Sequence, residues 1–563
     1  MTIKKQKLPI GDSDFRRIRQ DNSYYVDKTL FIEEVLEDSA RIILLPRPRR
    51  FGKTLNLTTL RYFFEKSYPN QENNNAYLFA GLKIKERECF IEDQGQYPVI
   101  YLTFKDIKFS KFDDSLKAIK KLISEEYRRH KYLLESDLLD KGEQDKYNKI
   151  INREADLDVY ANSLRDLTEY LYRFHDKSLI LLIDEYDTPI HAGYAEGYYD
   201  EMVNFFRIFL GDALKDNPYL EKGVLTGILR VAKESIFSGL NNLGVYSLVR
   251  SEYKNCFGLT EEEVEKILAD YDLIDKLAEV RDWYNGYIFG GEIVYNPWSI
   301  LNFISSRDNL LEPYWINTSS NDIIRDLISQ ASSSVQRELE ALMQGVSIKR
   351  NLVETISFGE LGQDEDSLWS FLVFSGYLKA KFSKREGKYN YYELSIPNLE
   401  VEYLYETIIS SWLEGSFENH KLNDLLKFFV EGDVEGFELL LQDFVVSMLS
   451  YYDTAGRDPE RVYQAFVLGL LVNLQNNYEI KSNRESGYGR YDVLVIPKNT
   501  SKKGIIIEFK KILALKEETK DIALKKALTQ IEEKNYAQEL LDRGVKDILK
   551  LGVVFDGKRV WVK

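Results

Sequence analysis

The sequence predicts an α/β protein whose larger part is a parallel β-sheet covered by helices on both faces. Short apolar runs, typical of buried strands, occur at residues 42–45, 99–104, 179–183 and 224–229. Amphipathic helical patterns separate these runs at residues 54–64, 116–132 and 161–174. Strands that alternate with helices in this way form parallel sheets. The chain has 563 residues, too many for a single core, so we expect two to four domains.

The composition is that of a globular protein from a reducing compartment. With 44% apolar and 30% charged residues, the chain is not of the disordered class. Its two cysteines and four scattered histidines predict neither a disulfide framework nor a zinc site. Carboxylates should therefore bind any metal, which favours Mg²⁺ or Mn²⁺. The net charge of −15 argues against a general nucleic-acid-binding surface but allows a local basic site.

Neither export nor membrane insertion is predicted. The N-terminus, Met-Thr-Ile-Lys-Lys, lacks the apolar stretch of a signal peptide. The longest apolar runs, such as residues 465–474, reach only about half of the roughly 20 residues that a membrane span requires. We therefore expect a cytoplasmic protein without a membrane partner.

The pattern changes along the chain and predicts four segments. Residues 1–255 carry the alternation of strands and helices, and residues 256–412 form a helical lid followed by a winged-helix-like region. Residues 413–425 are polar and are interpreted as a linker. Residues 426–563 form a smaller second α/β domain.

Two local patterns support the middle segment. Thr260 and Glu263 have the spacing of a capping box at the start of a helix. An apolar helix at residues 368–374, a turn at 375–377 and alternating strands to residue 392 predict the winged-helix-like region.

A candidate phosphate-binding loop, Gly52-Lys53-Thr54, lies between the first apolar run and the first helical pattern. Free backbone N–H groups and the helix dipole favour anions at such a helix N-terminus. Lys53 would reach the β- and γ-phosphates of a nucleotide, and Thr54 would bind Mg²⁺. The triplet alone is a weak signal, and its position between a strand and a helix strengthens it.

Two acidic residues, Asp184 and Glu185, stand at the end of the third apolar run. Asp184 could complete the coordination of Mg²⁺ at the end of a buried strand. Glu185 could polarise a water molecule for attack on the γ-phosphate. Exposed acidic residues are also common at strand ends, so the pair is informative mainly together with the upstream triplet.

Further residues extend this candidate site. Arg47, Arg49 and Arg50 crowd the loop before the triplet, where they either neutralise phosphates or form a solvated basic turn. Thr226, in the fourth apolar run, could sense the γ-phosphate, and Arg230 could act as an arginine finger in cis or in a neighbouring subunit. Thr226 and Arg230 could equally well have purely structural roles.

This region resembles the AAA-ATPase-like family of bacterial proteins that also carry a nuclease domain. The resemblance covers roughly residues 5–300 and rests on the segments Leu8-Pro9-Ile10-Gly11, Tyr25-Val26-Asp27-Lys28-Thr29, Arg47-Pro48-Arg49-Arg50-Phe51-Gly52-Lys53-Thr54, Leu182-Ile183-Asp184-Glu185-Tyr186-Asp187, Trp283-Tyr284-Asn285-Gly286-Tyr287 and Tyr295-Asn296-Pro297-Trp298. It implies a P-loop NTPase fold that binds ATP and Mg²⁺ and assembles into a homo-oligomer. The usual first glycine of a P-loop is Arg47 here, and Pro48 has no N–H to donate, so this loop must be built differently.

A second candidate site lies near the C-terminus. Apolar runs at residues 493–496 and 505–507 flank a short polar turn and predict a β-hairpin. Asp492 begins one strand and Glu508 ends the other, so both carboxylates should lie at the same end and could bind one Mg²⁺ or Mn²⁺ ion. Lys510 should leave the same face as Glu508 and could orient a water molecule or stabilise charge on a phosphate. An ordinary hairpin with a surface ion pair is the alternative.

This segment resembles the PD-(D/E)XK nuclease superfamily, particularly members fused to the ATPase described above. Asp492, Glu508 and Lys510 fall on its catalytic motif. The resemblance implies that Gln530 and Tyr536, in and after the next helix, support the metal site or bind the nucleic-acid backbone.

Two further features bear on this resemblance. Glu485 and Arg490 match the subfamily's Glu-Ser-Gly-x-Gly-Arg turn. Members often carry an acidic residue on their first helix, and the segment Tyr463-Gln464-Ala465-Phe466 offers no counterpart.

These features predict an ATP-regulated, metal-dependent nuclease that acts on DNA or RNA, which the resemblance associates with defence against foreign genetic elements. ATP binding would move the lid and the winged-helix-like region and so control access to the nuclease site. The alternative is a regulatory or scaffold ATPase whose inactive nuclease-like domain binds only nucleic acid or a protein. A metabolic kinase is disfavoured because the pair of Asp184 and Glu185 suits water activation.

Overall fold

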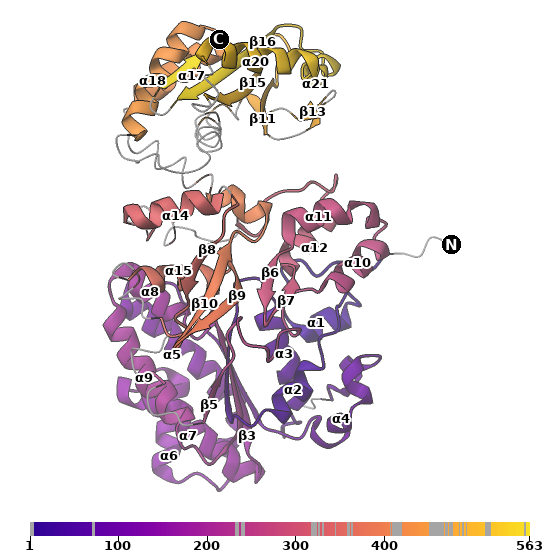
Figure 1. Cartoon of the computed structure of the whole chain (residues 1–563). Helices are drawn as coiled ribbons and strands as arrows, with labels where there is room; N and C mark the ends of the chain where they lie inside the picture. Colours follow the sequence, from indigo (N-terminus) through magenta and orange to yellow (C-terminus); the bar gives the residue numbers. More distant parts are fainter. Residues whose placement is uncertain are drawn as a thin grey trace. The chain divides into compact units, whose positions relative to one another are not determined.

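The computed structural model of the chain divides into two compact units, Met1–Val401 and Glu402–Lys563 (Figure 1). The structure describes residues 5–69, 74–230, 236–237, 242–316, 324, 327–328, 332–343, 345–356, 361, 364–405, 407, 419–449, 467, 471, 474, 477–482, 485–486, 489–490, 492–512, 519–556 and 559–563.

A five-stranded, fully parallel sheet forms the centre of the first unit. Its strands, in spatial order, are β2 (Val99–Thr103), β3 (Leu179–Asp184), β4 (Leu220–Gly227), β1 (Ile42–Pro46) and β5 (Leu243–Val245). The apolar runs become strands because a parallel sheet buried on both faces requires apolar side chains on both faces. The expected parallel α/β fold is confirmed.

The fourth strand differs from its expected range, 224–229. β4 begins at Leu220 and ends at Gly227. The backbone N–H groups of Ile228 and Leu229 donate instead to one carboxylate oxygen of Asp187, at 2.7 and 3.0 Å. The chain therefore leaves the sheet after Gly227, before the apolar run ends, because these two N–H groups bind Asp187 and not a neighbouring strand.

Helices cover both faces of this sheet, with α5 to α9 on one side and α1 to α4 on the other (Figure 1). Their bounds are α1 (Phe15–Gln20), α2 (Phe31–Glu37), α3 (Lys53–Phe64), α4 (Glu88–Asp93), α5 (Phe112–Arg129), α6 (Lys141–Asn152), α7 (Leu157–His175), α8 (Thr188–Glu196) and α9 (Tyr199–Leu214). Short 3₁₀ helices are η1 (Ala76–Phe79), η2 (Lys83–Glu86) and η3 (Lys131–Glu135).

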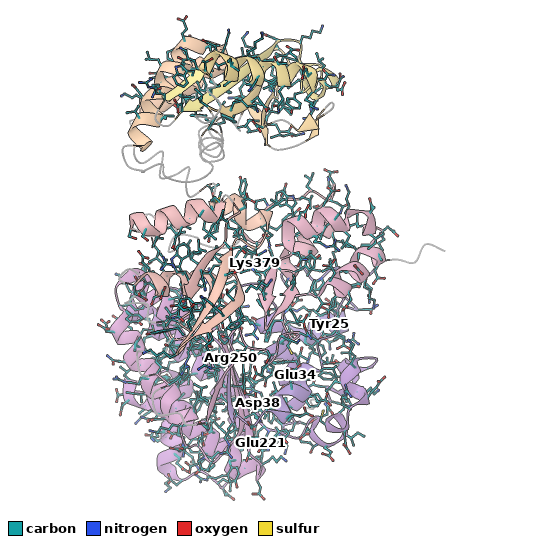
Figure 2. All side chains as sticks on the ribbon, in the orientation of Figure 1. Tyr25, Glu34, Asp38, Glu221, Arg250 and Lys379 are labelled. Carbon is teal, nitrogen blue, oxygen red and sulfur yellow. The ribbon has the colours of Figure 1, made fainter. Side chains whose placement is uncertain are left out.

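A polar cluster joins α2 to the segment that follows β5. The hydroxyl of Tyr253 donates to Asp38 at 2.7 Å, and the thiol of Cys256 donates to Glu34 at 3.2 Å. Figure 2 labels both acidic residues. Burial raises the pKa of the Cys256 thiol, so this cysteine stays protonated and serves packing.

The helical lid packs around its own apolar cluster, which includes Val264, Ile267 and Phe303. Its elements are α10 (Glu261–Asp270), η4 (Ile274–Lys276), α11 (Leu277–Tyr284), the hairpin of β6 (Tyr287–Phe289) and β7 (Glu292–Val294), and α12 (Pro297–Ser305). The expected capping box is present, because Thr260 and Glu263 each accept a hydrogen bond from the other's backbone N–H.

The winged-helix-like pattern also appears as a helix followed by a hairpin. After α14 (Ser333–Met343) come β8 (Ile348–Asn351), α15 (Glu365–Phe374), β9 (Lys379–Glu386) and β10 (Tyr389–Ser395). The three strands form an antiparallel sheet in the order β8-β10-β9. The turn between α15 and β9 contains Gly376 at φ = +91°, a conformation that favours glycine.

The second unit contains a mixed five-stranded sheet in the order β11-β14-β15-β16-β17, in which β15 and β16 are parallel and the other neighbours are antiparallel. Its elements are α17 (Asn419–Glu431), α18 (Val434–Leu449), β11 (Tyr478–Ser482), β12 (Glu485–Ser486), β13 (Gly489–Arg490), β14 (Val493–Pro497), β15 (Gly504–Lys511), α20 (Lys520–Glu533), α21 (Gln538–Asp542), β16 (Ile548–Asp556) and β17 (Arg559–Val562).

The expected linker, residues 413–425, is partly helical. α17 begins at Asn419, and the apolar side chains of Leu425 and Leu426 join the core of the second unit. Polar residues alternate with these leucines, so the segment resembled a linker although it is amphipathic. The remainder of the linker range lies outside the described residues.

Candidate functional site

The candidate phosphate-binding loop turns sharply into α3 at Gly52. This residue is the N-cap of the helix and has φ = +86°, which side chains other than glycine rarely allow. The ammonium of Lys53 is buried and donates to the backbone oxygens of Arg47 at 3.0 Å and Pro48 at 3.1 Å. It also forms an ion pair with Glu185, with Nζ 3.2 Å from Oε1. The loop therefore closes around the side chain of Lys53.

Thr54, in the first turn of α3, and Asp184, the last residue of β3, are in direct contact. The hydroxyl of Thr54 donates to Oδ2 of Asp184 at 2.8 Å. The hydroxyl of Thr226 donates to Oδ1 at 2.7 Å, and that of Thr103 donates to Oδ2 at 3.1 Å. The sheet order explains this cluster, because β4, which carries Thr226, lies between β3 and β1.

The carboxyl of Asp184 is buried among these three hydroxyls. Burial raises its pKa, and the neighbouring charge of Glu185 acts in the same direction. Hydrogen bonds from Thr226 and Thr54 lower the pKa, and so does the charge of Lys53. A divalent cation beside Asp184 would favour the ionised carboxylate further.

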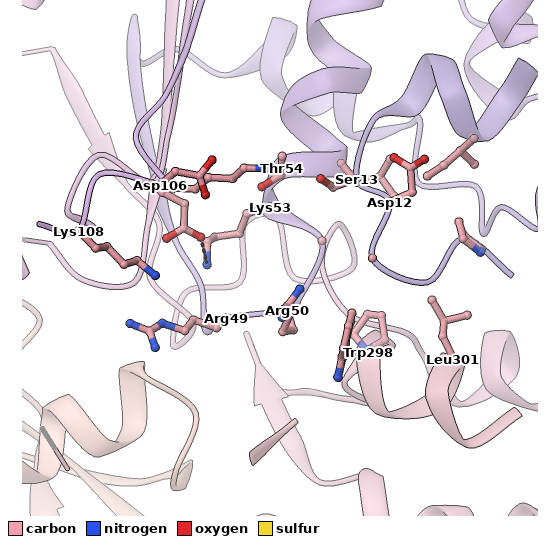
Figure 3. Close-up of a pocket in the computed structure, with 18 residues that line it drawn as sticks. Asp12, Ser13, Arg49, Arg50, Lys53, Thr54, Asp106, Lys108, Trp298 and Leu301 are labelled. Atoms are coloured by element: carbon pink, nitrogen blue, oxygen red, sulfur yellow. Dashed lines mark ion pairs between the residues drawn. The ribbon is translucent and has the colours of Figure 1, made fainter. Parts of the chain in front are cut away.

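A pocket of about 480 Å³ opens beside this cluster (Figure 3). Its wall contains five cationic side chains against three acidic ones, namely Arg49, Arg50, Lys53, Lys105 and Lys108 against Asp12, Asp106 and Glu185. Because the whole chain has a net charge of −15, this excess of cations is local. A concave site with such a wall attracts a ligand that carries several negative charges.

Like charges are held close together in this wall. Burial, followed by the charge of Arg49, lowers the pKa of Arg50 and also that of Lys108. The charge of Glu185 acts in the opposite direction on both groups. An anionic ligand would stabilise the charged forms in the same way that Glu185 does.

The other part of the pocket wall is apolar. Pro9, Ile18, Trp298 and Leu301 line it. The guanidinium of Arg50 lies over the ring of Trp298, 4.1 Å from the ring centroid, in a cation–π contact. Trp298 enters the site because α12 folds back over the loop, and no local pattern in the sequence indicates that contact.

Arg47 does not belong to this pocket. Its guanidinium is fully buried and donates to the backbone oxygens of Pro46 at 2.9 Å and Tyr246 at 2.6 Å. It also lies over the rings of Phe257 and Phe289, at 5.0 and 5.4 Å. Burial lowers the pKa of Arg47 to about 10. The sequence suggested that Arg47 either neutralises phosphates or lies in a solvated turn. Both interpretations are wrong, because Arg47 is buried in the core and stabilises the loop through its backbone hydrogen bonds.

Arg230 does not line the pocket either. The residues before it are held by Asp187, as described above, and the hydroxyl of Tyr186 donates to the backbone oxygen of Leu229 at 2.7 Å. The chain leaves β4 in a direction fixed by these bonds. Thr226, by contrast, contacts Asp184 directly.

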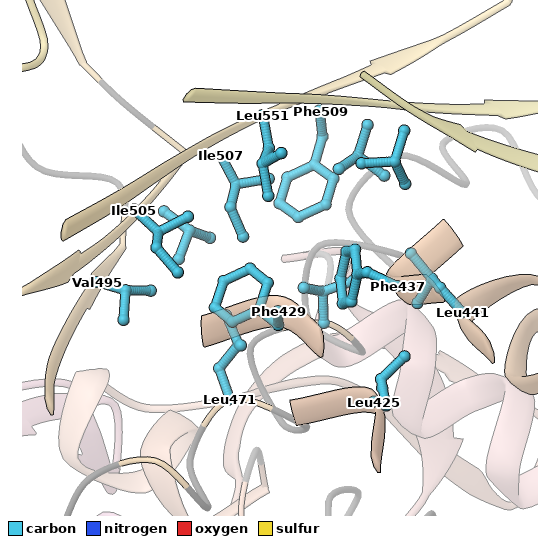
Figure 4. Close-up of a cluster of buried hydrophobic side chains, with 14 of the residues drawn as sticks. Leu425, Phe429, Phe437, Leu441, Leu471, Val495, Ile505, Ile507, Phe509 and Leu551 are labelled. Atoms are coloured by element: carbon cyan, nitrogen blue, oxygen red, sulfur yellow. The ribbon is translucent and has the colours of Figure 1, made fainter. Parts of the chain in front are cut away.

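The second candidate site lies on the hairpin of β14 and β15. Ile505, Ile507 and Phe509 pack into the core beside α17 and α18 (Figure 4). Side chains alternate along a strand, so Glu508 and Lys510 point to the opposite face. Lys510 Nζ lies 2.8 Å from Glu508 Oε1, which confirms that the two side chains meet.

Asp492 lies at the same end of the hairpin as Glu508. The last paired residues are Val493 and Ile507; Asp492 directly precedes Val493 and Glu508 directly follows Ile507, so both lie one residue beyond this pair. The backbone N–H of Phe509 donates to Asp492 Oδ2 at 2.8 Å. Burial raises the pKa of Asp492, while that N–H group and the charge of Lys510 lower it. β15 continues past Glu508 to Lys511, because it still pairs with β16 there.

Gln530 and Tyr536 lie on the same side of the sheet. The side-chain amide of Gln530 donates to the hydroxyl of Tyr536 at 3.2 Å. Burial raises the pKa of Tyr536, and the charges of Glu508 and Asp492 raise it too, which places this tyrosine beside the carboxylates. α20 reaches the sheet closely because Gly552 faces it, where a Cβ atom would lie 3.0 Å from that of Ala527.

The predicted turn of the nuclease-like domain forms a short hairpin of its own. Glu485 and Arg490 lie opposite each other in the short hairpin of β12 and β13. The segment at residues 463–466, where the sequence offers no acid, lies outside the described residues. Within the described part of the chain, no group of three or more His, Cys, Asp or Glu side chains is arranged to hold a metal. Asp492 and Glu508 are thus a two-carboxylate arrangement here.

Comparison with known proteins divides the chain in the same way. Residues 9–237 match the family model described as "Predicted AAA-ATPase", and residues 458–563 match that of the PD-(D/E)XK nuclease superfamily. The chain therefore carries an AAA-ATPase-like domain and a C-terminal PD-(D/E)XK nuclease superfamily domain, as the sequence resemblance predicted.

One curated relative is similar over nearly the whole chain. It is a protein of Azotobacter chroococcum mcd 1, named "Uncharacterized protein in vnfD 5'region". The two are 27% identical over 567 aligned positions, which cover 98% of this chain and 97% of the relative. The alignment thus spans both matched segments of this chain.

The helices of the structure are short or polar in comparison with a membrane span. Among the residues described by the structure, none of the helices combines the length and the apolar character that crossing a bilayer requires.

Proposed function

We propose that the first unit binds and hydrolyses ATP at the pocket beside Lys53. The contact of Asp184 with Thr54, at 2.8 Å beside a cation-rich pocket that Thr54 lines, is the observation that carries this proposal. A hydroxyl and a carboxylate side by side at a helix N-terminus fit the preference of Mg²⁺ for oxygen ligands. Lys53, with Arg49 and Arg50, fits the charge of a triphosphate.

The apolar wall suits the nucleotide base. Trp298 and Leu301 offer a flat ring and an aliphatic surface on the side of the pocket away from Asp106 and Lys108 (Figure 3). Arg50 already lies against Trp298, so the base would share or replace that contact. Stacking of this kind distinguishes a nucleotide from inorganic triphosphate.

Glu185 is the residue that we assign to hydrolysis. It has φ = +52°, a conformation uncommon outside glycine, and its carboxylate pairs with Lys53. A triphosphate that takes over the ammonium would free Glu185 to accept a proton from the attacking water. That water attacks the γ-phosphorus, and ADP leaves. Mg²⁺, when bound, would neutralise charge on the phosphates.

Arg230 enters the proposal as a finger supplied in trans. Because it does not line the pocket of its own chain, it would act in the site of a neighbouring copy of a homo-oligomer.

For the second unit we propose metal-dependent hydrolysis of phosphodiester bonds in DNA or RNA. Asp492 and Glu508 would hold Mg²⁺ or Mn²⁺, and the pair fits because both carboxylates lie at one end of the hairpin. Lys510 would orient the attacking water and stabilise charge on the phosphate. Gln530 would contact the nucleic-acid backbone, and the buried Tyr536, which accepts its hydrogen bond, would hold it in position. ATP binding in the first unit would regulate this cleavage, in a cytoplasmic defence against foreign genetic elements.

Cleavage assays test this proposal. The full chain is incubated with plasmid, linear duplex and single-stranded substrates, with Mg²⁺ or Mn²⁺, and with or without ATP. We expect cleavage that depends on the metal, changes with ATP, and is lost in Glu508→Ala and Lys510→Ala. Cleavage that persists in Glu508→Ala would mean that another group or a contaminant is responsible.

The alternative is a regulatory or scaffold ATPase whose nuclease-like domain only binds nucleic acid or a protein. The observation that favours it is the two-carboxylate arrangement noted above, with no third acidic or histidine ligand in the described residues. Nucleic-acid binding without cleavage under every condition, together with intact ATP hydrolysis, would support this alternative.

A further inference from the structure

The β9–β10 hairpin of the first unit carries an unusual density of cations. Residues 379–395 contain five Lys or Arg residues and two Glu residues, within a chain of net charge −15. Residues 381–390, which include the hairpin tip, are exposed. Figure 2 labels Lys379 at the other end of β9, and Pro397 accepts a hydrogen bond from its ammonium at 3.4 Å. The remaining cations are therefore presented to solvent by an anchored hairpin.

Most of these cations share one face of the β8-β10-β9 sheet. Lys381 and Lys349 both lie opposite Glu393, from the two neighbouring strands. A β-bulge between Tyr391 and Tyr392 shifts the register, so Lys384 lies opposite Tyr391. An extra residue in one strand reverses the side-chain alternation beyond it, which puts Lys381 and Lys384 on the same face.

Aromatic rings are interleaved with the cations on this face. The ammonium of Lys349 lies 5.3 Å from the ring centroid of Tyr391, and that of Lys388 lies 5.2 Å from that of Tyr389. The side chain of Tyr389 is 46% exposed. We refer to these residues as the wing surface: Lys349, Lys381, Lys384, Lys388, Tyr389 and Tyr391.

The cations of the wing surface are only partly neutralised. Glu386 forms an ion pair with Lys384, and Glu393 accepts a hydrogen bond from Ser383 at 3.4 Å. The proximity of Lys384 lowers the pKa of Lys349.

We propose that the wing surface binds single-stranded nucleic acid, with phosphates on the lysines and unpaired bases stacked on Tyr389 and Tyr391. Charge complementarity gives the sign of the partner, because the four lysines outnumber the two glutamates of this face and therefore attract an anion. The exposed ring of Tyr389 and the half-buried ring of Tyr391 select the single strand, because bases can stack on a protein ring only when they are not stacked in a duplex. This site is separate from the Asp492–Glu508 site and does not require it.

Binding is measured by fluorescence anisotropy of a labelled 20-nucleotide oligo-dT on the full chain, with EDTA present so that metal-dependent cleavage cannot occur. The test variant combines Lys381→Glu, Lys384→Glu and Lys388→Glu. The control variant combines Lys111→Glu, Lys117→Glu and Lys121→Glu, three exposed lysines at the start of α5 and along it. Both variants change the net charge equally, so only the position of the charges differs.

We expect the wing variant to weaken binding at least tenfold and the control variant to weaken it less than twofold. The plot of log affinity against log salt should become shallower by about 2 for three lost phosphate contacts. Tyr389→Ala should weaken binding by about 5-fold to 150-fold, the range for loss of one stacked base. If the charge-reversed variant melts at a lower temperature, the corresponding Lys→Gln variant replaces it.

Absence of binding in the unchanged protein would overturn the proposal, and so would an equal loss of affinity in the wing and control variants. It would also be overturned if duplex DNA bound more tightly than the single strand and Tyr389→Ala did not change that affinity. Oligo-rU serves as a second probe, and binding of either probe through the wing surface supports the proposal. Binding is measured without metal and cleavage with metal, so failure of this site and failure of the nuclease proposal are distinguishable.

Discussion

The ammonium nitrogen of Lys53 lies 3.2 Å from a carboxylate oxygen of Glu185. The same ammonium donates to the backbone oxygens of Arg47 and Pro48, at 3.0 and 3.1 Å. The residue assigned to phosphate binding and the residue assigned to water activation therefore neutralise each other. A triphosphate must compete with Glu185 for Lys53, and this competition makes separate predictions for binding and for hydrolysis.

Replacing Glu185 by Gln should separate the two steps. We expect ATP affinity to stay equal or to rise, because the amide no longer competes for the charge of Lys53. Hydrolysis should fall by a factor of about 10² to 10⁴, the usual contribution of a general base. Calorimetry gives the affinity, and phosphate release gives kcat. A variant that keeps the rate of the unchanged protein would remove Glu185 from the mechanism.

The hydroxyl of Thr226 should stabilise the folded protein. Thr226→Val keeps the shape of the side chain but removes the donor at 2.7 Å from the buried Oδ1 of Asp184. We expect a loss of about 1–3 kcal/mol in the free energy of unfolding, because a buried acceptor loses its partner. Thr226→Ser retains the hydroxyl and is the matched control. Equal losses in the two variants would show that packing, and not the hydrogen bond, is responsible.

The strands and the contact between the two nucleotide-site motifs could be predicted from sequence. A parallel sheet buries both faces of each strand, so its strands are continuous apolar runs, and Asp184 ends one such run. The contact with Thr54 follows because parallel strands end at the same edge of a sheet. The hairpin that carries Asp492 and Glu508 was predictable for a similar reason, since two apolar runs flank a short polar turn.

The position of Trp298 and the burial of Arg47 could not be predicted in this way. Trp298 reaches the pocket only because α12 returns to the loop, a tertiary contact without a local signature. Arg47 is buried because Phe257 and Phe289 cover its guanidinium and backbone oxygens far along the chain accept its hydrogen bonds. A cluster of arginines in a loop sequence does not reveal which of them such distant groups will accommodate.

Gly286, in the lid, should not tolerate a side chain. It has φ = +98°, and a Cβ atom there would lie 2.2 Å from the backbone oxygen of Pro397. We expect Gly286→Ala to destabilise the first unit by about 2–5 kcal/mol, the sum of backbone strain and overpacking. Gly291→Ala is the matched control, because Gly291 has φ = +90° with open space around it. Thermal melting measures both, and equal shifts would show that the contact with Pro397 is unimportant.

Glu400 should make the stability of the first unit depend on pH. Its buried carboxyl accepts hydrogen bonds from the backbone N–H of Trp315 at 2.6 Å and from the hydroxyl of Ser299 at 2.9 Å. Burial raises the pKa of Glu400 to about 8, from 4.5 in an unstructured chain. Between these values the native state holds a proton that the unfolded state has lost.

The contribution of Glu400 is therefore complete below pH 4.5 and is lost as pH rises to about 8. Within that window the free energy of unfolding should fall by about 1.4 kcal/mol per pH unit from this group. Glu400→Gln should remove that slope. Urea unfolding at several pH values across the window measures it, and parallel curves for the two proteins would contradict the assignment.

Calorimetric titration of Mg·ATP into the full chain and into Lys53→Ala tests the central claim most directly. The ammonium of Lys53 is the buried cation around which the loop closes, and we assign it to the β- and γ-phosphates. We predict measurable binding to the unchanged protein and none to the variant, at a temperature where circular dichroism shows both proteins to be folded. Equal affinities in the two proteins would contradict the account, because no other arrangement described here places a cation at the phosphates in the same way.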